Sequence, residues 1–114
     1  MAQIDEYNFG YIIIAGKKHL NDVMIYPDGT VEEWWRTEGH TVRPDDITGV
    51  FSSEPDVLII GTGATGMMKV PFDIYELCRE KNIELIVETT ADAVHIFNQK
   101  KKNAQTAAGL HLTC

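Results

Sequence analysis

Three glycines follow an apolar run in the segment VLIIGTGATG, residues 57–66. Gly61, Gly63 and Gly66 have the spacing of a loop that binds a dinucleotide. Such a loop needs a helix directly behind it, because the N-terminus of that helix binds the pyrophosphate. Here the residues MMKVP, 67–71, come next, and proline disfavours a helical conformation in the residue before it. We therefore predict that the glycines let the backbone leave a sheet sharply, and that no cofactor binds them.

A binding cleft at this loop is the alternative. Glu88 closes the next apolar segment roughly 20 residues beyond the loop, where an acidic residue would contact a ribose. The carboxyl ends of strands in open α/β sheets also tend to form crevices. A small anion or polar ligand would then lie among residues 61–67, Thr89, Thr90 and His111.

His111 and Cys114 form the pattern H-x-x-C, which offers two possible metal ligands. A second pair at ligand spacing is missing from the sequence, so we expect no metal site. A strand would also send the two side chains to opposite faces unless the end of the chain curls. For Cys114 to act as a nucleophile, a histidine or a helix start would have to lower the pKa of its thiol.

Several other residues have simple structural interpretations. Thr89 and Thr90 precede a predicted helix, where a threonine oxygen can cap free N–H groups. Asn98 could hydrogen-bond a loop backbone and fix the exit of that helix, with ligand binding as the alternative. Cys78 completes an apolar helical face and is expected to be buried.

Two adjacent tryptophans give the clearest indication of binding. A strand would point Trp34 and Trp35 to opposite faces. One indole can then belong to the core, while the other is exposed or covered by a partner, since tryptophan is favoured at interfaces. Met67 and Met68 would add a soft apolar rim to the glycine loop.

Apolar spacing predicts the elements that position these residues. The first third predicts three antiparallel strands, in FGYIIIAG, HLNDVMIY and TVEEWW, with turns at residues 16–18 and 27–29. Three later segments place apolar residues at i, i+3 and i+4, which is typical of one helical face; they are Ile47/Val50/Phe51, Ile74/Leu77/Cys78 and Ala93/Ile96/Phe97. Between and after these helices, VLIIG, IELIVE and TAAGLHLTC are typical of buried strands. We expect an α/β fold of three layers, with a mixed central sheet, helices and an additional N-terminal antiparallel β-hairpin layer.

Composition limits the classes of partner. The chain has 114 residues, 44% of them hydrophobic and 24% charged, so we expect a single globular domain over residues 1–114. The formal net charge of -7 repels phosphate backbones and anionic lipid, so we expect neither nucleic-acid nor membrane partners. Two cysteines make no disulfide framework, and the first residues lack the pattern of a secretory signal. These features predict a cytoplasmic protein.

An ordered set of stretches carries a family resemblance. Trp35, Gly39 and His40 near a turn are followed by PDDI, VLIIGTG, VPFD, TTADAVHIFN and GLHLTC. Together they resemble the small domain family of the adipogenesis-associated protein, to which a mitochondrial complex I assembly factor is more distantly similar. The resemblance implies a compact three-layer fold and no established reaction, and eukaryotic members look like assembly or interaction factors. The positions that match the family pattern are Gly61, Gly63, Thr90, Asn98, His111 and Cys114, whereas GATGMMK and NQKKKNAQT depart from it.

Two classes of function remain open. The first is a noncatalytic interaction or assembly module that uses the glycine-rich loop, an exposed tryptophan and a sheet edge, so that a protein partner or a second copy covers Trp34 or Trp35. The alternative is a small-molecule-binding protein or enzyme with a cleft at Gly61–Gly66, near Thr90 and His111. The sequence offers no Ser-His-Asp arrangement and no carboxylate pair that would identify a reaction.

Overall fold

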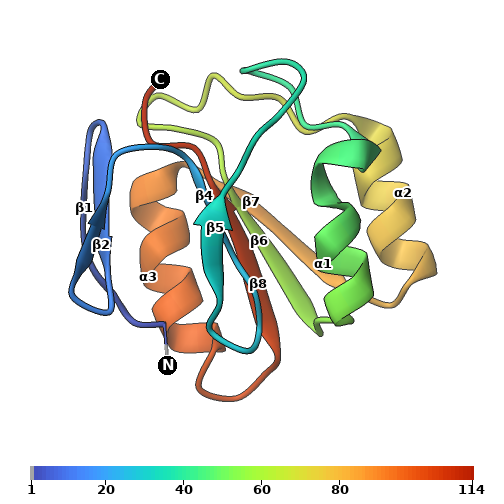
Figure 1. Cartoon of the computed structure of the whole chain (residues 1–114). Coiled ribbons are helices and arrows are strands. Elements are labelled where there is room, and N and C mark those ends of the chain that lie inside the picture. Colours follow the sequence, from blue (N-terminus) through green and yellow to red (C-terminus); the bar gives the residue numbers. More distant parts are fainter. Residues whose placement is uncertain (1) are drawn as a thin grey trace.

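A computed structural model describes residues 2–114 and places their helices and strands in layers (Figure 1). In chain order the elements are β1 (Ile4–Asn8), β2 (Tyr11–Ile14), β3 (Lys17–His19), β4 (Val23–Ile25), β5 (Val31–Glu33), the 3-10 helix η1 (Pro44–Ile47), α1 (Thr48–Ser53), β6 (Val57–Gly61), α2 (Phe72–Glu80), β7 (Glu84–Glu88), α3 (Thr90–Lys100) and β8 (Thr106–Leu110). The predicted α/β architecture, with a mixed sheet and an extra N-terminal antiparallel layer, is confirmed.

The larger sheet has five strands in the order β5-β4-β8-β6-β7. β6 runs parallel to both β7 and β8, while β4 is antiparallel to β8 and to β5. Every residue of β6 and of β8 is buried, as expected for strands covered on both faces. The same expectation is wrong for β7, which is exposed at both ends and half-buried between them because it is an edge strand. The carboxyl ends of β6 and β8 lie side by side, because Gly61 is paired with Leu110.

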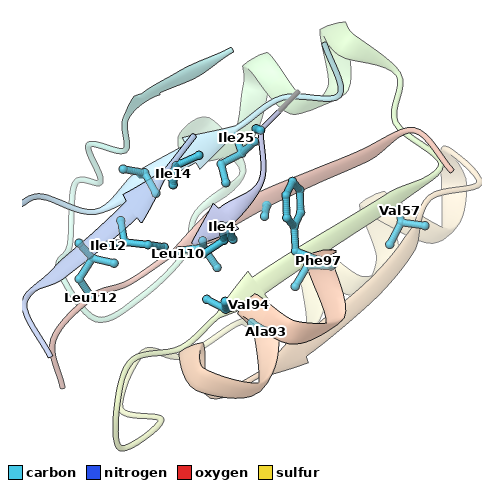
Figure 2. Close-up of a cluster of buried hydrophobic side chains, with 14 residues drawn as sticks. Ile4, Ile12, Ile14, Ile25, Val57, Ala93, Val94, Phe97, Leu110 and Leu112 are labelled. Carbon is cyan, nitrogen blue, oxygen red and sulfur yellow. The ribbon is translucent and has the colours of Figure 1, made fainter. Parts of the chain in front are cut away.

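The smaller sheet, β1-β2-β3, is antiparallel and covers the same face of the large sheet as α3. Side chains of β1, β2 and α3 meet those of β4, β6 and β8 in one apolar cluster (Figure 2). A second cluster on the opposite face contains Trp34 and residues of α1 and α2. Two filled faces therefore hold the central sheet in a three-layer arrangement.

The expectation of three N-terminal strands is wrong, because the structure has five. β1 lacks the apolar pattern that predicts a strand, since most of its residues are polar and exposed. The predicted strand HLNDVMIY is divided into β3 and β4, and Leu20 between them is exposed. Asp22 lies in this break, where its carboxylate bonds to other segments rather than to a strand neighbour.

The three predicted helical faces are confirmed, with one change in the first. Ile47 ends η1 and Val50 belongs to α1, and both are buried. α2 begins at Phe72 behind Pro71, so a break does separate it from the glycine loop, as proline predicts. Within residues 2–114, each helix is too short or too polar to cross a membrane.

Candidate functional site

The glycine loop holds the chain's own tail. The Ala64 N–H donates to Thr113 O at 2.7 Å, and the Met67 N–H donates to Cys114 O at 3.0 Å. Gly63 has φ +103°, and a Cβ there would lie 2.6 Å from Thr113 O. Glycine is therefore required at this position, both for its backbone conformation and for the close approach of the tail. The N–H groups of Ala64, Gly66 and Met67 donate to backbone carbonyls, and α2 begins only at Phe72.

Thr90 ties the loop, α3 and the tail together. Its buried hydroxyl accepts from the Gly63 N–H at 2.8 Å and donates to His111 O at 2.6 Å. A Cβ on Gly61 would lie 2.8 Å from the same oxygen. The expected capping role of Thr89 and Thr90 is wrong, because the side chain of the N-cap residue Thr89 makes no capping hydrogen bond. The hydroxyl of Thr90 is used by the tail instead.

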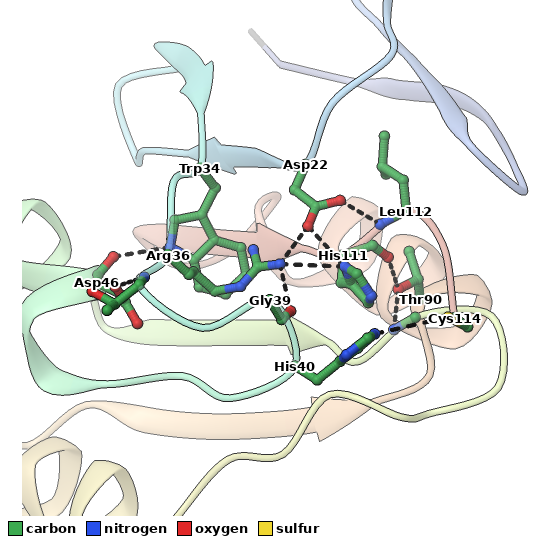
Figure 3. Close-up of polar contacts among 12 residues, drawn as sticks. Asp22, Trp34, Arg36, Gly39, His40, Asp46, Thr90, His111, Leu112 and Cys114 are labelled. Atoms are coloured by element: carbon green, nitrogen blue, oxygen red, sulfur yellow. Dashed lines mark hydrogen bonds and ion pairs between the residues drawn. The ribbon is translucent and has the colours of Figure 1, made fainter.

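A buried polar cluster lies beside this junction (Figure 3). Asp22 Oδ2 accepts from Arg36 Nη2 at 2.6 Å and from His111 Nδ1 at 2.7 Å, while Asp22 Oδ1 accepts from the Leu112 N–H at 2.8 Å. Burial raises the pKa of Asp22, but the hydrogen bonds from His111, Leu112 and Arg36 outweigh it, so the pKa of this carboxyl lies below its ordinary value. Asp22 is therefore an ionised anchor for the tail.

Arg36 joins this cluster to Trp34. Its guanidinium lies 4.5 Å over the indole ring and also donates from Nη2 to Gly39 O at 2.9 Å. The Trp34 Nε1–H donates to Asp46 O at 2.9 Å, and a Cβ on Gly109 would lie 2.9 Å from the indole. Trp34 is thus packed on β8 by its own chain, and Trp35 is the exposed member of the pair.

His111 and Cys114 both reach His40, because the tail curls after β8. The His40 and His111 rings meet edge to face with centroids 5.5 Å apart, and Cys114 Sγ lies 3.8 Å from His40 Nε2. Within residues 2–114, no group of three or more His, Cys, Asp or Glu side chains is arranged to hold a metal ion. His111 is buried and its Nε2 has no protein partner in this part of the chain.

A surface hollow borders the polar cluster and is lined in part by Asp22 and Arg36. It has a volume of about 330 Å³, and its lining includes Leu20, Asp22, Trp34, Trp35, Arg36 and Leu112. Leu20 is 69% exposed and Trp35 is 78% exposed. We call these two side chains and the hollow between them the Leu20–Trp35 surface.

The structure groups some of the predicted site residues and separates others. Gly61, Gly63, Thr90, His111 and Cys114 meet at the junction of loop and tail. Other candidates lie apart from the polar cluster: Gly66 and Met67 are exposed on the outer part of the loop, Thr89 only begins α3, and Trp35 lies on the Leu20–Trp35 surface. The expected rim is wrong for Met68, which is buried in the core.

Asn98 has a backbone role, as predicted, but its partner is a strand rather than a loop. Its Nδ2 donates to Ile4 O at 2.9 Å, and its Oδ1 accepts from the Ile4 N–H at 3.1 Å. The side chain therefore continues the edge of β1 and fixes α3 against the smaller sheet. The sequence analysis also missed Asp22 and Arg36, because neither belongs to a recognisable motif. Asp22 lies inside the predicted strand HLNDVMIY, and Arg36 directly follows the predicted strand TVEEWW.

This fold and this junction define an α/β domain whose glycine loop retains the tail of the chain. By its sequence, the chain belongs to the family described as protein of unknown function DUF498/DUF598, which it matches over residues 4–111.

Solved structures share this fold along almost their whole length. A conserved hypothetical protein of Pyrococcus horikoshii is 27% identical, with a TM-score of 0.89 over 97% of this chain and 98% of that one. An outer membrane protein of Bartonella henselae is 28% identical, with a TM-score of 0.83 over 99% of this chain and 96% of that one. A Mth938-like domain of Bordetella pertussis is 17% identical, with a TM-score of 0.59 over 97% and 85%, and is similar in fold.

Proposed function

We propose that this chain is a noncatalytic protein-interaction or assembly domain, and that a partner covers the Leu20–Trp35 surface. The observation that supports this most is the exposure of Trp35 and Leu20 at the rim of a hollow. Contiguous exposed apolar side chains mark interaction sites, and tryptophan is enriched among the residues that dominate binding energy. Because Trp34 is already packed in the core, Trp35 is the indole available to a partner.

The buried polar cluster supports a structural rather than a catalytic reading. A general acid or base must come within hydrogen-bonding reach of the proton it transfers. His111 is buried, and its Nδ1–H is bonded to Asp22, which in turn holds the Leu112 N–H. These contacts fix the tail in place, and they leave the imidazole covered.

The family resemblance fits the same proposal. The eukaryotic members of the family of the adipogenesis-associated protein look like assembly factors, and an acidic domain with exposed apolar side chains suits that role. We propose the cytoplasm as its location, since both cysteines of the described chain are free.

Photo-crosslinking tests the proposed surface. A photoreactive phenylalanine analogue at position 35 of the full chain, expressed in its native cells, should form a discrete adduct with another protein. The same analogue at exposed Lys102, beyond the end of α3, is the matched control. Trp35→Ser should then weaken binding of the captured protein by about thirtyfold, as expected for an interface residue worth about 2 kcal/mol.

Equal labelling from positions 35 and 102 would contradict the proposal. An adduct with a second copy of the chain would instead identify the assembly as a homo-oligomer. A Trp35→Ser variant that binds as tightly as the wild type would show that the surface is not the interface.

A small-molecule site is the second candidate, and the volume of the hollow favours it. Ligand pockets start at roughly 300 Å³, and this hollow reaches about 330 Å³ with Arg36 in its lining. A ligand at the glycine loop, by contrast, would have to displace Thr113 and Cys114. Thermal-shift screening with nucleotides and metabolites is the test, since a ligand at a hundred times its Kd should add about 2.7 kcal/mol. A panel without stabilisation would contradict this candidate.

A further inference from the structure

β7 forms an open edge of the large sheet, at the opposite end from β5. The Glu84 N–H donates to Asp56 O and Glu88 O accepts from the Thr62 N–H, both at 2.9 Å, so alternate residues of β7 direct their backbone groups to the β6 side. Leu85 and Val87 lie between them and direct their N–H and C=O groups outward. In the described part of the chain, β7 pairs only with β6. An edge of this kind can accept another strand.

The two edges of this sheet differ in how far they are protected. β5 has only three residues, two of which are the exposed Glu32 and Glu33. Short, charged strands are the usual protection against edge pairing. β7 has five residues, with Leu85, Ile86 and Val87 half-buried in succession. The middle of this edge therefore lacks the charge that protects β5.

An apolar hollow of about 310 Å³ lies beside β7, lined by Phe72, Tyr75, Cys78, Arg79, Ile83 and Leu85, among others. Phe72 is 72% exposed and Tyr75 is 43% exposed. Side chains of a strand alternate between its two faces, so a strand added to β7 would place every second side chain on the side of this hollow. Protection of an edge would not need exposed aromatic side chains next to it, whereas docking of a segment would use them.

Charge identifies the kind of segment. Glu84 and Glu88 are exposed at the two ends of β7, and the chain as a whole carries a net charge of -7. Glu84 Oε1 lies 3.6 Å from Lys100 Nζ, but its side chain is still 56% exposed and open to a second cation. A second copy paired antiparallel about Ile86 would place Glu84 opposite Glu88, which is unfavourable. A segment with Lys or Arg at its ends would instead meet opposite charges. We propose that β7 binds an extended segment of a partner protein, with apolar residues at alternate positions and basic residues flanking them.

This docking edge is separate from the Leu20–Trp35 surface, because β5 and β7 are the opposite edges of the sheet. Failure of either proposal would leave the other standing. The probe for β7 is a library of short random peptides displayed on phage and selected on the wild-type chain. The expected result is enrichment of peptides with alternating apolar residues and basic ends.

Two substitutions of Leu85 then separate backbone pairing from side-chain contact. Leu85→Pro removes an outward N–H and leaves the β6 side of the strand intact, which edge strands tolerate. Leu85→Ala removes a similar amount of side chain but keeps the N–H. An enriched peptide should bind Leu85→Pro at least about tenfold more weakly than Leu85→Ala, because a bound strand would lose a backbone hydrogen bond and meet the proline ring.

Charge reversal gives a test that does not depend on the proline variant folding. A variant with both Glu84→Lys and Glu88→Lys should bind the basic peptides about tenfold more weakly than the wild type does, since two attractive charge pairs become repulsive. Lack of enrichment on the wild type, equal binding by both Leu85 variants, or full binding by the charge-reversed variant would each overturn the proposal. A wild-type dimer that Leu85→Pro dissociates would overturn it too, by showing that the occupant is a second copy.

Discussion

Among single residues, Asp22 connects the most segments of the chain through its side chain. Its carboxylate receives Arg36, His111 and the Leu112 N–H, and thereby connects the start of β4 to the exit of β5 and to the tail. The side chains of Arg36 and Asp22 are only 5% and 16% exposed, so the pair is largely shielded from water. Removing one charge from a buried pair leaves the other uncompensated, and this costs more than the pair contributes.

Asp22→Asn should lower the free energy of unfolding by about 3 kcal/mol at neutral pH, because buried Arg36 would lose its counter-charge. The amide oxygen of the variant can still accept from the Leu112 N–H, but an NH2 donor replaces Oδ2 in front of Arg36 and His111, so those two hydrogen bonds are lost together with the charge. Asp45→Asn, at an exposed carboxylate, is the control and should change stability by less than about 0.5 kcal/mol. Urea unfolding measures both variants, and equal stabilities would contradict the role given to Asp22.

The difference in unfolding free energy between the wild type and Asp22→Asn, measured by urea unfolding at several pH values, should depend on pH. The pKa of Asp22 is lowered in the folded state, so its contribution to stability is present above the ordinary aspartate pKa of 3.8. It is lost as the pH falls from that value through the lower folded pKa. The stability gap between wild type and Asp22→Asn should therefore be full at neutral pH and shrink below about pH 4.

Asp22 and Arg36 could not be predicted as a site from the sequence. Asp22 lies 89 positions from His111 and 90 from Leu112 in the chain, so their contacts leave no local pattern. Gly63, Thr90 and His111 could be grouped in advance, because each lies at or near the carboxyl end of a strand in an open sheet. What the sequence did not show is that the tail itself would fill the space between them.

At the scale of elements, the glycine loop and the tail act as one unit. Gly63 and Gly10 both have positive φ, but only Gly63 has backbone where a Cβ would lie, whereas nothing lies within 4 Å of a Cβ on Gly10. A side chain at either position would therefore be strained by the positive φ, but only at Gly63 would it also overlap neighbouring backbone atoms.

Gly63→Ala should destabilise the fold by roughly 2 kcal/mol more than Gly10→Ala, because overlap adds to the cost of positive φ. The second variant should cost about 1–2 kcal/mol from its φ alone. Chemical unfolding of both variants is the measurement. If Gly63→Ala proved no worse than Gly10→Ala, the tail would not be held as the structure places it.

Strand number was harder to predict than helix position, for a physical reason. Each helix repeats its apolar spacing within a few residues, so Ile74 and Cys78 of α2 were placed correctly before the fold was known. β1 buries one side chain fully, Ile4, and is held by its pairing with β2 and by Asn98 of α3, which lies 94 positions away. Pairing over such distances leaves little trace in the sequence of one strand.

In the whole molecule, the tail fills the region at the carboxyl ends of the strands where a ligand could otherwise bind. In open α/β sheets this region commonly forms a crevice for ligands. Here the carbonyls of the tail accept from the Ala64 and Met67 N–H groups, and Thr90 and Asp22 hydrogen-bond to its backbone at residues 111 and 112. Most of the exposed large apolar side chains lie at the two opposite edges of the sheet, near Trp35 and near Phe72, although Met67 on the loop is exposed as well. We therefore infer that the protein binds through the edges of its sheet rather than through the glycine loop.

Amide hydrogen exchange at the loop shows whether the tail or a ligand occupies the Ala64 and Met67 N–H groups. In the free protein the Ala64 and Met67 amides should exchange slowly, because both donate to the tail. Saturating concentrations of a dinucleotide or of inorganic phosphate should leave those rates unchanged. Fast exchange at Ala64 in the free protein, with protection appearing only when the dinucleotide is added, would show that the glycines bind a nucleotide and would contradict the account.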